Sequence, residues 1–272
     1  MSALATAVSL LFVPGHRPDR FAKAAASGAD VVIVDLEDAV AAGDKEQAAA
    51  ALRQAWPGLD ASRTALRINA EGTPWFEGDL KLAATLGPAA LVLPKAESPA
   101  TLFAVRARLD RSVALVALIE TARGLSAVHE MARSGAVDRL AFGPLDLQVD
   151  LGLRAGDDER ELDPARFALV LASRIGELPP PIDGPSVALD DAARLAADAE
   201  RSLRTGFGAK LCIHPAQLAS VHQAFAPSAD AVERARRIVE AARAGGAVQL
   251  DGKMIDRPVV LMAERVLQRA RR

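Results

Sequence analysis

The sequence predicts a (β/α)8 barrel, a closed ring of eight parallel strands surrounded by helices. Short apolar runs alternate with Ala-rich helical stretches, and most runs are apolar almost throughout, as in parallel strands buried on both faces. The length of 272 residues is ordinary for one such domain. The alternative is a doubly wound sheet. It is disfavoured because no apolar run is followed by the GxGxxG phosphate-binding pattern that such sheets often carry.

The strand and helix signals follow one another in order. The predicted strands occupy residues 9–15, 30–38, 63–69, 90–95, 114–120, 139–146, 181–187 and 210–217. Ser98 and Asp163, each directly before a proline, are predicted helix N-caps. Asp190 is predicted to cap a helix that ends at Gly206. These signals assign residues 1–225 to the barrel domain.

The end of the chain departs from the alternating pattern. Residues 226–272 are too long for one barrel helix, and they contain two helical stretches separated by a polar, glycine-bearing loop. We expect them to form a helical arm appended to the barrel.

Composition excludes several classes of function. The chain is 50% hydrophobic and 25% charged with a net charge of −2, and this near balance gives no footprint for a nucleic-acid or anionic-membrane partner. Aromatic residues make up only 4%. The single cysteine, Cys212, excludes an intrachain disulfide, and no apolar run has the length of a membrane span. We therefore expect a cytoplasmic protein.

Charged and polar residues gather where the predicted strands end. They are Asp35 to Asp38, Arg67, Asn69, Lys95, Glu120, Asp146, Asp183 and His214, whereas the strand starts are small or apolar. Because barrel enzymes place their active sites at the carboxyl ends of the strands, this asymmetry predicts a catalyst.

Two carboxylates of this group suggest a metal site. Glu120 and Asp146 end consecutive strands, which lie about 4.8 Å apart in a sheet. Oxygen ligands without cysteine favour Mg²⁺. The alternative is that each carboxylate caps the helix that follows it.

Two basic residues have more than one interpretation. Arg67 alternates with apolar neighbours and is predicted to point into the barrel, where it suits a substrate carboxylate or an enolate oxygen. It could instead form a structural ion pair with Asp35 or Glu37. Lys95 is favoured as an ion-pair partner of the acidic residues over a Schiff-base lysine.

Eight ordered motifs resemble a known family. They are LFVPGHRPDRFAKA, VIVDLEDAV, LRIN, LVLPKAES, LIETARGL, FGPLDLQVDLG, GAKLCIHPAQL and GKMIDRP, and they extend over residues 9–265. In this order they resemble the citrate lyase β-subunit-like enzymes of the HpcH/HpaI aldolase and malyl-CoA lyase superfamily.

The resemblance implies a Mg²⁺-dependent barrel, a homotrimer, that cleaves or forms a carbon–carbon bond in a CoA thioester. Glu120 and Asp146 match the family's metal ligands. Arg67 matches the arginine that binds the keto acid and faces the enolate. Asp256 matches a catalytic aspartate that the C-terminal arm brings to a neighbouring subunit's site.

Further positions are implied by the same motifs. Phe12 and Lys23 fall where the family contacts the CoA end of the substrate, and Ile182 and Asp183 fall at another substrate-contacting segment. Glu37 and Asp38, with Lys95, match groups that surround the metal ligands without binding the metal directly.

Two departures from the family pattern leave the substrate open. Pro144 stands where many relatives have an acid or a small polar residue, and residues 173–191 form a short segment with a loose match. Citryl-CoA, malyl-CoA, methylmalyl-CoA and citramalyl-CoA are all handled within the family, and oxaloacetate is one keto acid it releases. The alternatives are a CoA-independent class II aldolase acting on 2-keto acids, and a lyase subunit that needs a partner.

Overall fold

The computed structural model describes residues 3–243, 248–250 and 253–270. The chain divides into two compact units, Met1–Val221 and His222–Arg272. Within the described residues, no helix combines the length and apolar character needed to cross a membrane.

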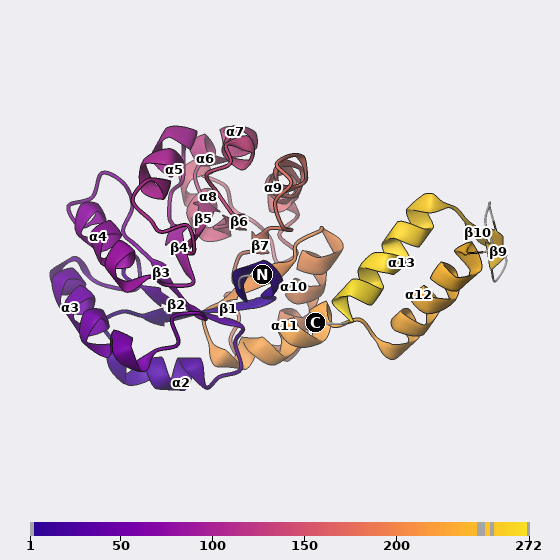
Figure 1. Cartoon of the computed structure of the whole chain (residues 1–272), viewed down its shortest axis with the longest axis horizontal. Helices are drawn as coiled ribbons and strands as arrows, with labels where there is room; N and C mark the ends of the chain where they lie inside the picture. Colours follow the sequence, from indigo (N-terminus) through magenta and orange to yellow (C-terminus); the bar gives the residue numbers. More distant parts are fainter. Residues whose placement is uncertain (1–2, 244–247, 251–252, 271–272) are drawn as a thin grey trace. The chain divides into compact units, whose positions relative to one another are not determined.

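The first unit is a closed barrel of eight parallel strands, which confirms the predicted fold class (Figure 1). The strands are β1 (Ser9–Pro14), β2 (Val31–Asp35), β3 (Thr64–Arg67), β4 (Ala90–Leu93), β5 (Ala114–Ile119), β6 (Arg139–Phe142), β7 (Ile182–Asp183) and β8 (Ala209–Cys212). Each strand pairs with the next along the chain, and β8 pairs with β1 through Ser9 opposite Lys210. This closure excludes the doubly wound alternative.

Every strand lies inside its predicted run or within one residue of it, but most strands are shorter than the runs. The run predicted over 139–146 stops at Phe142 because Pro144 takes the first position of a helix, where its missing N–H is not needed. The run predicted over 181–187 shrinks to two residues, since Gly184 and Pro185 follow at once.

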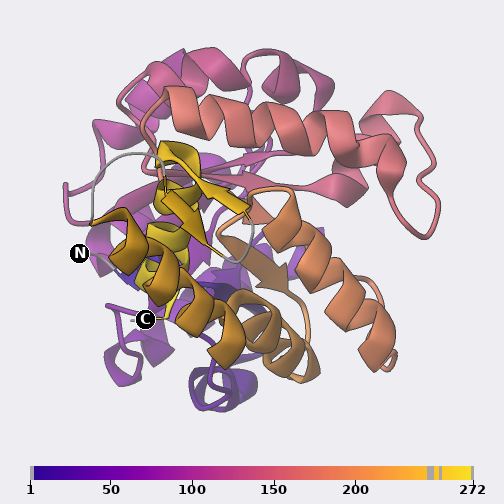
Figure 2. The same cartoon turned by 90° about the vertical axis from the view of Figure 1, so that its right-hand side faces the viewer.

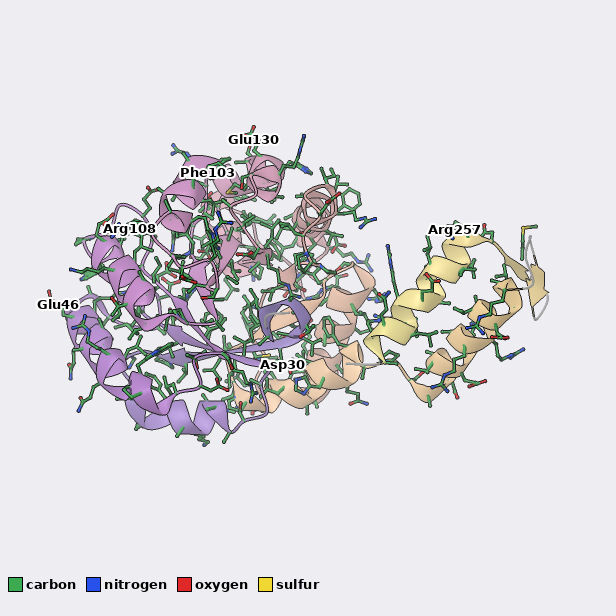
Figure 3. All side chains as sticks on the ribbon, viewed as in Figure 1. Asp30, Glu46, Phe103, Arg108, Glu130 and Arg257 are labelled. Carbon is green, nitrogen blue, oxygen red and sulfur yellow. The ribbon has the colours of Figure 1, made fainter. Side chains whose placement is uncertain are left out.

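Helices cover the outside of the barrel. Their bounds are α2 (Phe21–Ala25), α3 (Lys45–Ala55), α4 (Phe76–Leu86), α5 (Pro99–Arg106), α6 (Ala122–Ser126), α7 (Val128–Arg133), α8 (Pro144–Leu151), α9 (Asp163–Ile175), α10 (Ala192–Arg204) and α11 (Leu218–Phe225). Figure 3 shows Glu46 and Glu130 projecting outward from α3 and α7. Both residues lie on the solvent side of the helical layer.

The structure confirms one of the three predicted helix caps. Ser98 is the N-cap of α5, and its hydroxyl accepts a hydrogen bond from the Thr101 N–H at 3.2 Å. Asp163 is not a cap, because a 3-10 turn runs directly into α9 and makes Asp163 the first helical residue. The prediction of Asp190 as a cap is wrong by one residue: Asp191 caps α10.

The amino-terminal end of the barrel is closed. Helix α1 (Ala3–Thr6) places Leu4 in the apolar interior formed by the strands. Arg139, the first residue of β6, is 2% exposed, and its guanidinium donates to the carbonyls of Leu4, Ala7 and Pro180 at 2.7, 3.1 and 2.9 Å. The site must therefore lie at the opposite, carboxyl-terminal end.

The second unit is a helical hairpin. Helices α12 (Ala229–Ala242) and α13 (Arg257–Arg269) lie side by side, with strands β9 (Val248–Leu250) and β10 (Lys253–Ile255) at one end (Figure 1; the same unit is turned toward the viewer in Figure 2). Its buried core is small and consists of Ala235, Ile238, Ile255 and Ala263. The predicted glycine-bearing loop falls partly on residues 244–247, outside the described residues.

Candidate active site at the carboxyl end of the barrel

The carboxyl ends of β2 to β6 bring five acidic side chains and two basic ones together. Asp35 and Arg67 are the last residues of β2 and β3, Glu120 directly follows β5, and Asp146 lies in the first turn of α8. We call the acids Asp35, Glu37, Asp38, Glu120 and Asp146 the carboxylate cluster. Ion pairs or electrostatic interactions connect its members to Arg67 and Lys95.

Arg67 is held in a fixed orientation. Its Nε and Nη2 donate to the two oxygens of Asp35 at 2.8 and 2.6 Å, and its Nη1 lies 3.1 Å from Glu37 Oε2. The guanidinium carbon lies 4.7 Å from the centroid of the Phe12 ring. Burial works to lower the pKa of Arg67, but the hydrogen bonds to Asp35 and the surrounding carboxylates raise it above its usual value. The structural ion pair of Arg67 with Asp35 or Glu37, which the sequence left as an alternative to substrate binding, is therefore present with both acids.

Asp35 is in turn fixed by the backbone that follows β2. Its Oδ1 accepts from the Glu37 N–H at 2.9 Å and its Oδ2 from the Ala39 N–H at 3.2 Å. Lys45 donates to the carbonyls of Leu36 and Glu37 at 2.8 and 2.7 Å. Lys45 thus holds the backbone that follows β2. No sequence signal indicates this role, because Lys45 lies in an ordinary amphipathic helix.

Lys95 connects three other acids. Its ammonium lies 2.6 Å from Glu37 Oε1 and 4.0 Å from Asp146 Oδ1, while its backbone N–H donates to Glu120 Oε1 at 2.8 Å. Burial works to lower the pKa of Lys95, but the hydrogen bond and charge of Glu37 raise it. Lys95 thus forms the predicted ion pairs with acidic residues, namely Glu37 and Asp146.

Two of the carboxylates are deeply buried and electrostatically strained. Glu120 is 1% exposed, and burial, reinforced by Glu37 and Asp146, raises its pKa to about 8. Burial also raises the pKa of Glu37, whose Oε2 faces Arg67 Nη1 as an ion pair without hydrogen-bond geometry. When all five acids are ionised, they exceed the two bases by three negative charges, so the cluster favours a cation.

The donor set fits a hard divalent cation. Glu120 and Asp146 each offer carboxylate oxygen, and Mg²⁺ commonly binds one or two carboxylates with water and substrate oxygens in the remaining positions. Within the described ranges no three His, Cys, Asp or Glu side chains converge as a metal-binding group. Glu120 accepts from Lys95 and does not cap α6, whose N-cap is Thr121.

Gly143 makes room for Glu120. A Cβ atom at Gly143 would lie 2.5 Å from both Cβ and Oε2 of Glu120, closer than such atoms approach one another. Sequence reasoning missed this residue. The signal that could have found it is a small residue directly between the end of β6 and Pro144.

The other predicted substrate-contacting residues lie in different surroundings. Phe12 stacks against Arg67 beside the cluster, and Lys23 is exposed on α2. Ile182 is fully buried in the apolar interior of the barrel. Asp256, in the second unit, is exposed and caps α13 by accepting from the Val259 N–H at 3.2 Å.

Asp183 belongs to a separate buried network. Ser202 donates to its Oδ2 at 2.5 Å, the Gly184 N–H donates to its Oδ1 at 2.9 Å, and Arg166 Nε lies 3.4 Å from Oδ1. Burial works to raise the pKa of Asp183, but Lys210 and Arg166 lower it below its usual value. Both oxygens are thus engaged between β7 and the helices, away from the carboxylate cluster.

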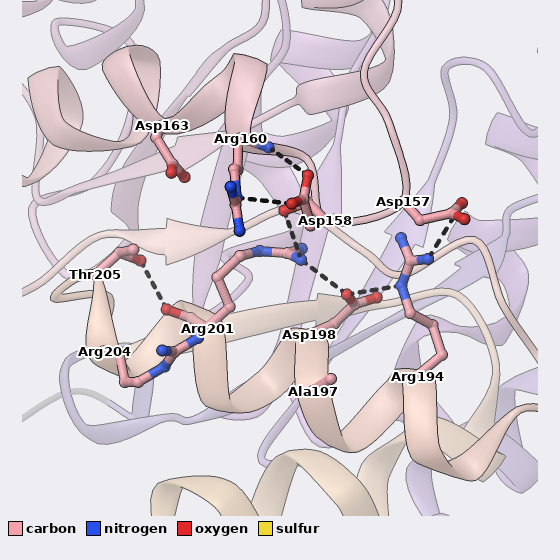
Figure 4. A pocket seen from close by; sticks show the side chains of 10 residues that line it. All are labelled: Asp157, Asp158, Arg160, Asp163, Arg194, Ala197, Asp198, Arg201, Arg204 and Thr205. Atoms are coloured by element: carbon pink, nitrogen blue, oxygen red, sulfur yellow. Dashed lines mark hydrogen bonds and ion pairs between the residues drawn. The ribbon is translucent and has the colours of Figure 1, made fainter.

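A polar cavity of about 570 Å³ lies between the 157–163 segment and α10 (Figure 4). It is lined by Asp157, Asp158, Arg160, Asp163, Arg194, Ala197, Asp198, Arg201, Arg204 and Thr205. Arg194 and Arg201 both lie 3.0 Å from Asp198. None of the predicted site residues lines it, and its four acids balance its four arginines.

Known proteins resemble this chain over almost its whole length. The family model described as HpcH/HpaI aldolase/citrate lyase matches residues 8–215. A citrate lyase subunit beta-like protein of Mycobacterium tuberculosis is 38% identical over 99% of this chain and 98% of its own. The L-malyl-CoA/beta-methylmalyl-CoA lyase of Cereibacter sphaeroides is 33% identical over 96% of this chain and 93% of its own.

Solved structures agree. The CitE protein of Mycobacterium tuberculosis in complex with magnesium, acetoacetate and coenzyme A superimposes with a TM-score of 0.88 and 36% identity, covering 98% of this chain and 100% of that one. Magnesium is present in that relative, which confirms the predicted cofactor for the family. The match in sequence, the closed barrel and the acidic site agree, and the chain belongs to the HpcH/HpaI aldolase/citrate lyase family of enzymes.

Proposed function

We propose that this protein is a Mg²⁺-dependent lyase that cleaves a short hydroxy-carboxyacyl-CoA into a keto acid and an acyl-CoA. The observation that carries the proposal is the convergence of Glu120, Asp146 and Arg67 in a cluster with excess negative charge. Relatives named for citrate lyase and malyl-CoA lyase activity, and a relative with magnesium, acetoacetate and coenzyme A bound, support the class of substrate.

Glu120 and Asp146 would hold the metal. A bound Mg²⁺ supplies Lewis acidity that favours loss of a proton from a substrate hydroxyl. With that proton taken up by a base, which we assign to the Asp256 carboxylate, cleavage of the adjacent carbon–carbon bond would leave the electron pair on the thioester side as an enolate. Return of the proton to the enolate carbon would give the acyl-CoA. Arg67, held by Asp35, presents a fixed positive charge that stabilises the developing enolate oxygen without having to reorganise.

Asp256 would complete the site from a second copy of the chain, in a homotrimer. The second unit has a four-residue buried core, too small for a stable domain of its own. It exposes Met254 and Met262, at 71% and 56%. At the carboxyl end of the barrel, Val149 and Val187 are 83% and 61% exposed. Association of these apolar surfaces would bring Asp256 to the cluster, where its carboxylate moves a proton.

The test is a keto-acid release assay on the purified protein. Citryl-CoA, malyl-CoA and citramalyl-CoA are each supplied with Mg²⁺ and with EDTA. We expect metal-dependent release from one of them, lost in Asp146→Ala and kept in Asp157→Ala, whose side chain is fully exposed.

Each outcome has a distinct meaning. Release of free coenzyme A without keto acid would favour a thioesterase, the activity for which a 33% identical relative is named. Mg²⁺ binding without turnover of any thioester would favour the CoA-independent aldolase or a partner-dependent subunit. Absence of Mg²⁺ binding would refute the proposal.

A further inference from the structure

The turn that follows β4 holds Lys95 in an unusual conformation. Its φ is +47°, in the left-handed region that favours glycine. Two backbone N–H groups hold the turn against β5 and the residue that follows it. The Lys95 N–H donates to Glu120 Oε1 at 2.8 Å, and the Ala96 N–H donates to the Leu118 carbonyl of β5 at 3.2 Å. Gly124 lies so close to the Ala96 carbonyl that a Cβ there would be 2.4 Å from it.

A lysine costs stability at this position relative to glycine, so its side chain is expected to have a use. The ammonium lies 2.6 Å from Glu37 Oε1 and 4.0 Å from Asp146 Oδ1, between two acids of the carboxylate cluster. The Lys95 side chain is 37% exposed, whereas that of Glu37 is 6% exposed. The ammonium is thus a positive charge beside one of the two carboxylates that we assign to the metal.

The two parts of Lys95 act in opposite directions on a bound dication. The N–H fixes one oxygen of Glu120 and so orients this carboxylate before any metal arrives. The ammonium repels a dication that binds Asp146, because like charges at this range interact even in water.

We propose that Lys95 is a positioning residue that aims Glu120 through its backbone and limits metal affinity through its ammonium. This inference rests on the proposed metal site at Glu120 and Asp146. The role of the Lys95 ammonium would be to allow metal exchange. A metal that is held less tightly can leave and return with the substrate, while the N–H of Lys95 keeps the Glu120 carboxylate in place.

The test is Mg²⁺ binding by isothermal titration calorimetry, without substrate, on the full chain. Lys95→Met and Lys95→Gly both remove the ammonium and keep the backbone N–H, and the glycine variant also relieves the left-handed strain. We expect both to bind Mg²⁺ about tenfold more tightly. This is the effect in water of one unit charge on a dication about 6 Å away, the 4.0 Å from the ammonium to Asp146 Oδ1 plus a metal–oxygen bond of about 2 Å. Lys95→Arg keeps the charge and is expected to bind within about twofold of the wild type.

A purely structural role predicts the opposite sign. Weaker or unchanged Mg²⁺ binding in Lys95→Met would overturn the inference, provided that its circular dichroism spectrum matches the wild type. If Lys95→Met does not fold, Lys95→Gly decides the same question. Tighter binding in Lys95→Met but weaker binding in Lys95→Gly would also overturn the inference, because both variants lack the ammonium and keep the N–H that contacts Glu120. A wild type that binds no Mg²⁺, or Asp146→Ala that binds it equally well, would instead refute the proposed function itself.

Discussion

Gly143 makes the geometry of Glu120 testable by a single added methyl group. In Gly143→Ala the new Cβ would lie 2.5 Å from Glu120 Cβ and Oε2, although the backbone φ of −106° suits any residue. The strain is therefore steric. Overpacking of this kind typically costs about 1–3 kcal/mol. For a chain of this size it corresponds to a fall in Tm of roughly 2–10 °C. Because Glu120 must move, Mg²⁺ affinity should fall with it.

The assay is thermal unfolding by circular dichroism together with calorimetric Mg²⁺ titration. The matched control is Gly78→Ala in α4, where a Cβ would meet nothing within 4 Å. That variant should gain about 0.5–1 kcal/mol through helix propensity and keep its metal affinity. A Gly143→Ala protein with the Tm and Mg²⁺ affinity of the wild type would show that Glu120 is not confined as described.

Three further predictions concern buried groups. The pKa of Glu120, about 8, lies above that of the unfolded chain, so the folded state binds more protons between roughly pH 4.5 and 8. Stability measured in EDTA should therefore fall as pH rises through that window, and Glu120→Gln should flatten the decline. Arg139→Met leaves three carbonyls without this donor and should lower the free energy of unfolding by about 3 kcal/mol in urea titrations, without changing Mg²⁺ affinity. Burial raises the pKa of Cys212 to about 12, so Ellman's reagent should react with it only after denaturation; rapid labelling of the native protein would contradict this.

The architecture could be predicted from the sequence because parallel strands buried on both faces leave a strong local signal. Seven of the eight strands have four or more residues, and each falls within or next to an apolar run. The strand β7 is harder to delimit from the sequence, because its apolar run contains Gly184 and Pro185. These two residues end the strand, and only Ile182 and Asp183 pair with its neighbours.

The candidate site was accessible to the same reasoning only in part. Strand ends indicated Arg67, Glu120 and Asp146, because the carboxyl ends of the strands in a closed barrel converge on one opening. The backbone contact from Lys95 to Glu120 could not be anticipated, since a left-handed lysine has no sequence signature. The contacts of Asp183 depend on side chains from α9, α10 and β8, whose relative placement only the folded chain defines.

Because Arg139 and Leu4 close the amino-terminal end of the barrel, the site has an opening at the carboxyl-terminal end alone. With Leu4 filling the interior and Arg139 bonded across the amino-terminal end, small molecules must enter and leave the carboxylate cluster by the same opening. Whatever binds deepest has to arrive first and depart last. An enzyme whose site has one opening is expected to release its products in a fixed order. The product that binds deeper in the barrel is expected to act as a competitive inhibitor of the substrate.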